Sequence, residues 1–209
     1  MAATTDVALQ LAILLLAIVI FAIQYKHFQP KRTTTSARLR TKNRRTASLQ
    51  TNRHLTQATH FVSRAKATSD VSQSQSLAKN ALLEVETAIS LAPRDPAPLI
   101  LKALALDLLR RKSSALRSLD LALSAPRVKL PPGTERGDAL FKRAELKLEV
   151  NSRRRVDSAI EDLEEAVKVK LSGGNDKALC LLGRCYELKG MKDRVEWAFD
   201  EASRVHMGP

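Results

Sequence analysis

The stretch Leu181–Gly190 reads LLGRCYELKG and places a glycine, Gly183, inside an otherwise amphipathic helical pattern. A glycine inside a helix costs about 0.5–1 kcal/mol relative to alanine. Leu182 precedes this glycine, Tyr186 follows it by three residues, and a second glycine, Gly190, gives a turn signal. The pattern predicts a helix that accepts close packing from a neighbour at Gly183, with the tyrosine filling the space beside it.

The composition of the whole chain indicates an all-α protein. Aromatic residues make up 4% of the 209 residues, glycine and proline are sparse, and no run shows the alternation of a strand. The only cysteines, Cys180 and Cys185, are five residues apart and match no zinc or redox spacing, so we expect small, buried core residues.

A repeated pattern runs through the second half of the chain. Small or apolar residues recur with a spacing of four and then three, which places each set on one helical face. The four sets are Ala81/Val85/Ala88, Ala115/Leu119/Ala122, Ala159/Leu163/Ala166 and Val195/Phe199/Ala202. Their last members are 34, 44 and 36 residues apart. Such a period indicates a helical solenoid.

The last unit resembles the tetratricopeptide repeat, a helix-turn-helix motif. In that family the first helix carries a large residue, then Leu-Gly and Tyr, and the second helix carries Ala-x-x-x-Phe and a small residue. The matching residues here are Leu179, Leu182, Gly183, Tyr186, Gly190, Val195, Phe199 and Ala202. The resemblance implies a helix-turn-helix solenoid of about three to four repeats over residues 53–207.

The other repeats depart from this pattern in identifiable places. In the third repeat, Arg143 replaces the leucine and Lys147 replaces the tyrosine. About ten extra residues are expected in two loops, 128–137 and 151–155. In the first repeat, the first helix is polar. Only Leu55, Ala58, Val62 and Ala65 follow the helical spacing of apolar residues.

Residues 7–25, VALQLAILLLAIVIFAIQY, predict a transmembrane signal anchor. These nineteen uncharged residues would span about 28 Å as a helix, enough to cross a thin bilayer. A cleaved signal peptide is disfavoured because residues 1–6 carry an acid and no positive charge, and no clear cleavage site follows. We expect residues 1–6 to be a short non-cytosolic amino terminus.

A one-sided basic segment follows the predicted anchor. Eleven basic residues and no acid lie between the anchor and Asp70. Residues 26–52 are expected to be a disordered juxtamembrane linker, with Lys26 to Arg45 contacting anionic lipid. The basic flank places the carboxy-terminal domain in the cytosol, at the endoplasmic reticulum or a mitochondrial or plastid outer membrane. Nucleic acid is a less suitable partner because no aromatic side chains are interleaved from Gln29 to His60.

The resemblance implies a peptide-binding groove lined by first helices. Members of the family that bind the acidic tails of chaperones carry Lys, Asn and Arg at defined groove positions. At four of these positions this chain has other residues: Ile100, Leu104, Lys142 and Leu181. Only Lys177 matches the residue that the chaperone-binding members carry. We therefore predict a peptide that combines an apolar stretch with an acid, although the same residues also fit packing and solubility roles. The candidates are Ile100, Leu104, Lys142, Glu145, Lys177 and Arg184.

Two further features complete the sequence predictions. Trp197 lies on the last helix beside Phe199, and an exposed Trp197 would suggest self-association there. The run Glu161–Glu165 is expected to be a solvated helix face. No catalytic constellation, metal site or cofactor motif is predicted, so we expect no enzyme activity.

These observations predict a membrane-anchored, cytosolic protein-interaction scaffold that recruits peptide or protein partners to an organelle membrane. The arrangement resembles receptor subunits of organelle protein import. The alternative is a soluble organellar adaptor whose amino-terminal targeting segment is removed and whose basic tail binds nucleic acid.

Overall fold

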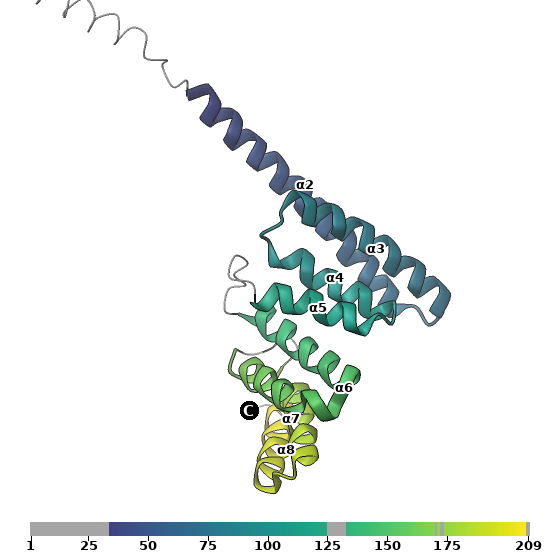
Figure 1. Cartoon of the computed structure of the whole chain (residues 1–209), viewed down its shortest axis with the longest axis vertical. Helices are drawn as coiled ribbons and strands as arrows, with labels where there is room; N and C mark the ends of the chain where they lie inside the picture. The colour runs from purple at the N-terminus through teal and green to yellow at the C-terminus, as the bar shows by residue number, and fades with distance from the viewer. Residues whose placement is uncertain (1–33, 125–132, 170, 172–173, 208–209) are drawn as a thin grey trace, which may run out of the picture. The chain divides into compact units, whose positions relative to one another are not determined.

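The computed structural model describes residues 34–124, 133–169, 171 and 174–207, with side chains described from residue 46. The chain divides into two compact units, Met1–Thr46 and Ala47–Pro209. Everything described below on packing belongs to the second unit. Seven helices and no strand are found among the described residues, which confirms the all-α prediction (Figure 1).

The helices form successive antiparallel pairs. Their bounds are α2 (Thr34–Ala67), α3 (Val71–Leu91), α4 (Pro96–Leu108), α5 (Lys112–Ser124), α6 (Thr134–Val169), α7 (Asp176–Lys189) and α8 (Lys192–Met207). α6 contains both helices of the third repeat, joined at Asn151 (Figure 1). From α3 to α8, each helix packs mainly against its neighbours along the chain, as in a solenoid.

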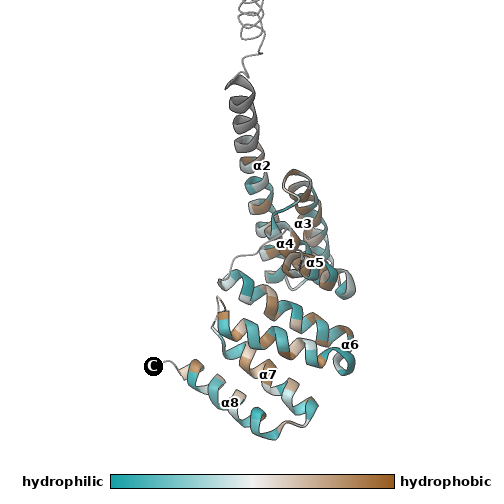
Figure 2. Ribbon diagram, turned by 60° about the vertical axis from the view of Figure 1, so that its left-hand side comes forward, coloured by the Kyte–Doolittle hydropathy of each residue, from teal (hydrophilic) through white to brown (hydrophobic). Residues whose placement is uncertain are grey.

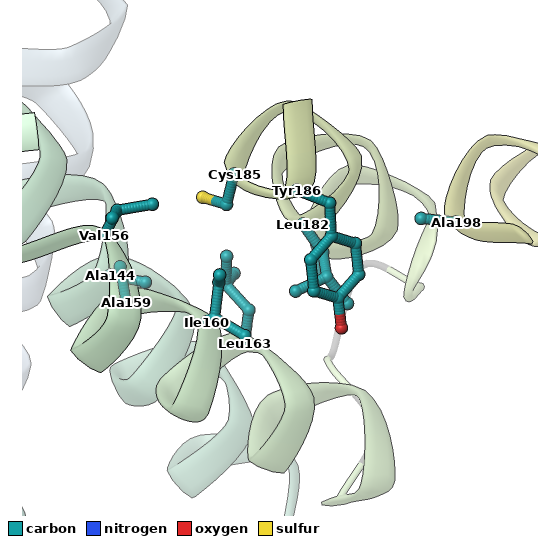
Figure 3. Packing of buried hydrophobic residues seen from close by; sticks show 10 residues of the cluster. Ala144, Val156, Ala159, Ile160, Leu163, Leu182, Cys185, Tyr186 and Ala198 are labelled. Atoms are coloured by element: carbon teal, nitrogen blue, oxygen red, sulfur yellow. The ribbon is translucent and has the colours of Figure 1, made fainter. Parts of the chain in front are cut away.

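The core is a row of three apolar clusters shared by consecutive helices. The first joins Val62 of α2 to Ala81 of α3 and Ala105 of α4. The second joins α4, α5 and the first half of α6 around Leu119. The third joins α6, α7 and α8, with Cys185 and Tyr186 of α7 packed towards Ile160 and Leu163 (Figure 3). The hydropathy colouring shows hydrophilic residues over much of α6 and α8 (Figure 2).

Gly183 lies where the sequence predicts a close helix contact. A Cβ atom built on Gly183 would lie 2.9 Å from Cζ of Phe199 on α8, and 3.1 Å from each Cε atom of that ring. Side-chain atoms do not approach one another this closely, so the glycine makes room for the aromatic ring. Leu182 and Tyr186 on either side of it are buried.

The amino ends of α3 and α4 are fixed by side-chain caps. The Asp70 carboxylate accepts a hydrogen bond from the Ser72 backbone N–H at 2.9 Å. Asp95 does the same for Ala97 at 3.0 Å, and Pro96 occupies the first turn. Both caps satisfy backbone donors that the helix itself leaves unpaired.

The third repeat differs from the sequence prediction. Residues 152–155 are helical and do not form the expected loop over 151–155. Only Asn151 departs from helical geometry (φ −163°, ψ 90°), and its side chain accepts a hydrogen bond from the Arg154 N–H at 3.1 Å. One capping residue therefore turns the chain, and the extra residues lengthen the helices. In the other predicted loop, helix α6 already begins at Thr134.

Helix α2 also differs from expectation. It begins at Thr34, within the segment 26–52 where the sequence predicts a disordered linker. This part of α2 contains no glycine or proline and several good helix formers, so helix propensity does not oppose its extension. Residues 26–33 lie outside the described part of the chain.

The predicted anchor, residues 7–25, and the amino terminus, residues 1–6, likewise lie outside the described residues. Among the helices that the structure describes, none combines the length and apolar character required to cross a bilayer. The side chains from Lys26 to Arg45, for which we predict lipid contact, are not described either.

The turns after α4 and α7 have the same hydrogen-bond pattern but different residues at the left-handed position. Gly190 has φ 70° and Arg110 has φ 62°. In both turns the following residue donates back to the helix, Arg111 to the Leu106 carbonyl at 2.9 Å and Met191 to the Tyr186 carbonyl at 3.0 Å. These are the bonds of a Schellman motif, in which glycine is preferred.

We expect Arg110→Gly to raise the free energy of unfolding by about 0.5 kcal/mol. The left-handed conformation costs an L-residue roughly 1–2 kcal/mol, and glycine would remove this cost. The greater conformational freedom of glycine in the unfolded chain offsets part of the gain. The measurement is urea unfolding followed by circular dichroism, with Gly190→Ala as the matched opposite, which should lower stability by about 1 kcal/mol. A loss of stability in Arg110→Gly would contradict this account of the turn.

Candidate functional site

A pocket of about 500 Å³ lies along the first helices of successive pairs. Its lining comes chiefly from α2, α4, the first half of α6 and the start of α7. The apolar residues include Ile100, Leu104, Leu108, Phe141 and Leu171. The charged residues are Lys66, Asp107, Asp138, Lys142, Glu145 and Lys177.

The structure brings together five of the six predicted groove residues. Ile100, Leu104, Lys142, Glu145 and Lys177 all line this pocket. Arg184 is exposed on α7 and does not line it. On α4 the lining is mainly apolar but includes Asp107, and on α6 and α7 it is mainly charged but includes Phe141.

The charge of Lys142 is held within the protein. Its Nζ lies 2.8 Å from Asp107 Oδ2 and 3.0 Å from Glu145 Oε2. Asp107 also binds Lys112 at 2.5 Å, and Lys112 reaches Glu149 at 2.5 Å. Lys142 therefore joins α4 to α6 and is not a free cation for a ligand.

The pKa values of this cluster follow from its contacts. Burial by itself would raise the pKa of Asp107, but hydrogen bonds from Lys112 and Lys142 outweigh it and lower that pKa. Burial would lower the pKa of Lys142, but Asp107 and Glu145 outweigh it and raise that pKa. Asp107, Lys112 and Lys142 therefore stay ionised at neutral pH.

Two lysines of the pocket remain available to a ligand. Lys66 at the end of α2 and Lys177 at the start of α7 are exposed, and neither forms an ion pair within the described residues. They place two positive charges on a pocket whose other lysine is already neutralised. The lining thus combines apolar side chains and three acids with two lysines that form no ion pair among the described residues.

Sequence reasoning missed several of these lining residues, among them Asp107 and Lys66. Asp107 lies seven residues after Ile100 and three after Leu104, so it shares their helix face, and this spacing could have placed it in the groove. Lys66 gave no such signal, because it falls at the end of a helix whose repeat pattern is weak.

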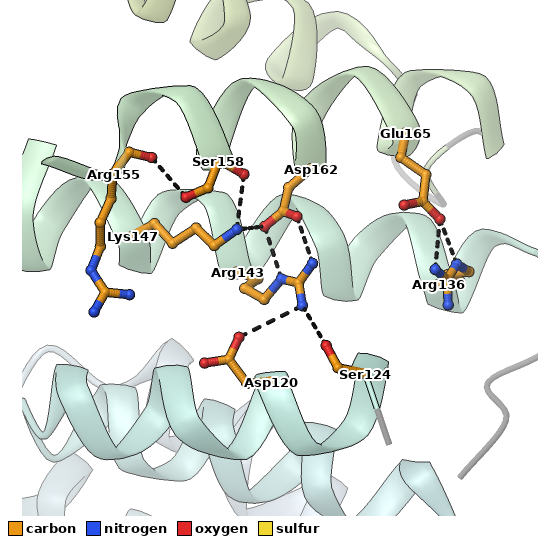
Figure 4. Close-up of polar contacts among 9 residues, drawn as sticks. All are labelled: Asp120, Ser124, Arg136, Arg143, Lys147, Arg155, Ser158, Asp162 and Glu165. Atoms are coloured by element: carbon orange, nitrogen blue, oxygen red, sulfur yellow. Dashed lines mark hydrogen bonds and ion pairs between the residues drawn. The ribbon is translucent and has the colours of Figure 1, made fainter. Parts of the chain in front are cut away.

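A second polar cluster, away from the pocket, explains why the third repeat lacks its leucine and tyrosine. Asp162 binds Arg143 with both oxygens, at 2.8 Å from Nε and 2.5 Å from Nη2. Lys147 Nζ lies 2.7 Å from the same carboxylate and donates to the Ser158 carbonyl at 2.8 Å. All three side chains are largely buried between the halves of α6 (Figure 4). The ion pairs lie where the repeat pattern would place a leucine and a tyrosine.

The prediction of a solvated face over Glu161–Glu165 is therefore wrong for most of the run. Asp162 is buried, and Glu165 Oε1 accepts from Arg136 Nε at 2.7 Å. Glu164 accepts a hydrogen bond from the Tyr186 hydroxyl at 2.8 Å. Burial first, and then Glu164, raise the pKa of Tyr186. Only Glu161 is exposed without such a contact.

The cysteines are divided between core and surface. Cys185 is buried, as predicted, and burial raises the pKa of its thiol to about 11. Cys180 is exposed, contrary to the prediction, because it points away from the face of α7 that carries Leu179 and Leu182. Trp197 of α8 is also exposed, with an exposed fraction of 51%.

Comparison with known proteins gives a fold and no family assignment. No family model matches the sequence, and no curated protein matches it. The chain is similar to a crystal structure of MamA, with 22% identity and a TM-score of 0.50 over 63% of this chain and 70% of that one. A second MamA structure, described as AMB-1, gives 16% identity and a TM-score of 0.48 over 75% and 93%. MamA is a tetratricopeptide-type repeat protein, so the described part of this chain has that helical repeat fold.

Proposed function

We propose that this protein is a membrane-anchored interaction scaffold that recruits peptide or protein partners to the cytosolic side of an organelle membrane. The observation that carries the proposal is the pocket on the first helices, where an apolar α4 face adjoins Lys66 and Lys177. Its role is binding and not catalysis. A receptor-like part in protein import is the most specific form of this proposal.

The pocket favours an apolar peptide segment with acidic residues at its ends. Ile100, Leu104 and Phe141 would bury apolar side chains of the partner, a contact worth roughly 25 cal/mol per Å². Lys66 and Lys177 would attract carboxylates, while Asp107 and Glu145 are each already paired with Lys142. The proposed peptide thus complements the two free charges and avoids the occupied ones.

The anchoring part of the proposal rests on sequence. Residues 7–25 form an uncharged apolar run and a basic segment follows it. In a single-pass arrangement the groove would be confined to one membrane surface, so a modest peptide affinity would be raised by effective concentration. The candidate membranes are those of the endoplasmic reticulum and the outer membrane of mitochondria or plastids.

A peptide display library tests the groove. Panning random peptides against the full chain is expected to enrich sequences that combine apolar residues with aspartate or glutamate. The double variant Lys66→Glu/Lys177→Glu should weaken the enriched peptides at least about tenfold, which corresponds to about 1.4 kcal/mol. Binding would be measured by fluorescence anisotropy of a labelled enriched peptide.

The matched control is Lys79→Glu. Lys79 is exposed on α3, forms no ion pair within the described residues and does not line this pocket. This variant should bind within about twofold of the unmodified chain. Equal loss in the control and in the double variant, or no loss in either, would show that the pocket is not the binding site.

A further inference from the structure

Helix α8 carries two different faces. Val195, Ala198, Phe199 and Ala202 lie on the face that packs against α7. The opposite face carries a row of exposed residues, which we call the outer stripe. The outer stripe consists of Asp193, Trp197, Asp200 and Arg204.

Contacts among the described residues do not explain the outer stripe. Trp197 is 51% exposed, although a tryptophan side chain is among the largest apolar surfaces a residue can offer. Within the described residues, Asp193 and Asp200 form no ion pair. Arg204 reaches only Glu201, three residues away at 3.3 Å, and both groups are in contact with water, so this pair contributes little.

The spacing of the outer stripe is that of a helix-pairing seam. Its members follow one another at intervals of four, three and four residues, which is the interval of the contact positions in a coiled coil. An α-helix with this spacing presents one continuous edge to a second helix. The stripe therefore has the geometry to contact a helix along its length.

The charges of the outer stripe complement a second copy in the reverse direction. When two such stripes lie antiparallel, Asp193 of each copy faces Arg204 of the other, and each Trp197 faces the Asp200 position. In a parallel pair, by contrast, Asp193 would face Asp193 and Arg204 would face Arg204.

We propose that two copies of this chain associate through an antiparallel pair of α8 helices, with the two Trp197 side chains covered at its centre. The pairing is isologous, since the same stripe serves both copies. One helix face buries less than the roughly 800 Å² per partner of a standard interface, so the association is weak and reversible. The pocket is not part of this surface, and a dimer keeps both pockets open.

Energy transfer between labelled copies tests this pairing. Cys180 is exposed and Cys185 is buried, so Cys180 can carry the donor or the acceptor dye. Full-length copies would be mixed in an excess of detergent micelles, and transfer followed against protein concentration. Trp197 is the only tryptophan, so its emission should shift to the blue as the copies associate.

Charge reversals supply the decisive comparison. Asp193→Arg alone and Arg204→Asp alone should each weaken self-association at least about tenfold, because both create like-charge contacts. A mixture of the two variants should regain transfer to within about threefold of the unmodified chain, since all facing pairs are then opposite in sign. The double variant Asp193→Arg/Arg204→Asp should also regain it.

Other outcomes overturn the proposal. Absence of concentration-dependent transfer in the unmodified chain would remove the dimer. A mixture no better than either single variant would place any association on another surface. Rescue in the mixture without rescue in the double variant would mean parallel pairing and would contradict the antiparallel assignment. Circular dichroism checks that these exposed substitutions leave the fold unchanged.

Discussion

Asp162→Ala is expected to lower the free energy of unfolding by about 3–5 kcal/mol. The substitution removes the carboxylate shared by Arg143 and Lys147, whose side chains are 13% and 11% exposed. Two cations would then stay buried between the halves of α6 with only weaker partners, such as the Ser158 carbonyl. Urea unfolding followed by circular dichroism measures the loss.

The control for this prediction lies on the same helical segment. Asp157 pairs with Lys189 at 2.8 Å, but its side chain is 70% exposed. Asp157→Ala should therefore cost less than about 1 kcal/mol. A similar loss in both variants would show that the burial of Asp162 is not what makes its ion pairs important.

A triple variant separates two effects on the free energy of unfolding: the loss caused by leaving buried charges unpaired, and the net contribution of the complete ion-pair cluster. In Arg143→Met/Lys147→Leu/Asp162→Leu, apolar side chains of similar size replace all three charges. We expect a free energy of unfolding within about 1 kcal/mol of the unmodified chain, or above it, because no buried charge is left unpaired. A loss as large as that of Asp162→Ala would mean that the ion pairs themselves stabilise the third repeat.

The second large effect is expected at Gly183, where Gly183→Val should lower the free energy of unfolding by about 2–3 kcal/mol. A Cβ atom at this position would lie 2.9 Å from the Phe199 ring, so the side chain forces α7 and α8 apart. The better helix propensity of a non-glycine residue offsets only part of this loss, about 0.5 kcal/mol. Thermal or urea unfolding gives the value.

The Phe199→Ala background provides the control for Gly183. In the unmodified chain, Gly183→Ala should lose about 1 kcal/mol, since contact with the ring outweighs the gain in propensity. Once the ring is removed, the same substitution should instead gain about 0.5–1 kcal/mol. If the sign does not change, the contact with Phe199 is not the reason for glycine at this position.

The repeat architecture could be predicted because it depends on local patterns. Small residues that recur at intervals of four and three positions lie on one face of a helix, so the buried face can be read from the sequence. Gly183 and Tyr186 together indicate where two helices pack most closely. Turns were less predictable. Asn151 ends one helix and caps the next with a single residue, and Arg110 adopts the conformation of a glycine, so neither carries the expected loop signal.

Long-range polar pairing limits what sequence shows about the site. The residues Ile100, Leu104, Lys142, Glu145 and Lys177 could be assigned to one surface from their helix faces. The ion pair between Lys142 and Asp107 could not be predicted from the sequence. The two residues are 35 positions apart, and the packing of α4 against α6 brings them together. Asp162 was misjudged for a similar reason, since its partners lie on the other half of α6.

Recruitment to a membrane requires that the helical repeats face the cytosol from an integral protein. The most direct test is protease protection of a carboxy-terminal tag on intact membranes, combined with an alkaline wash. The account predicts that the tag is digested while the protein stays in the washed membranes. A protected tag, or a protein that washes off, would contradict it and favour the soluble organellar adaptor, for which salt-sensitive nucleic-acid binding would be the next measurement.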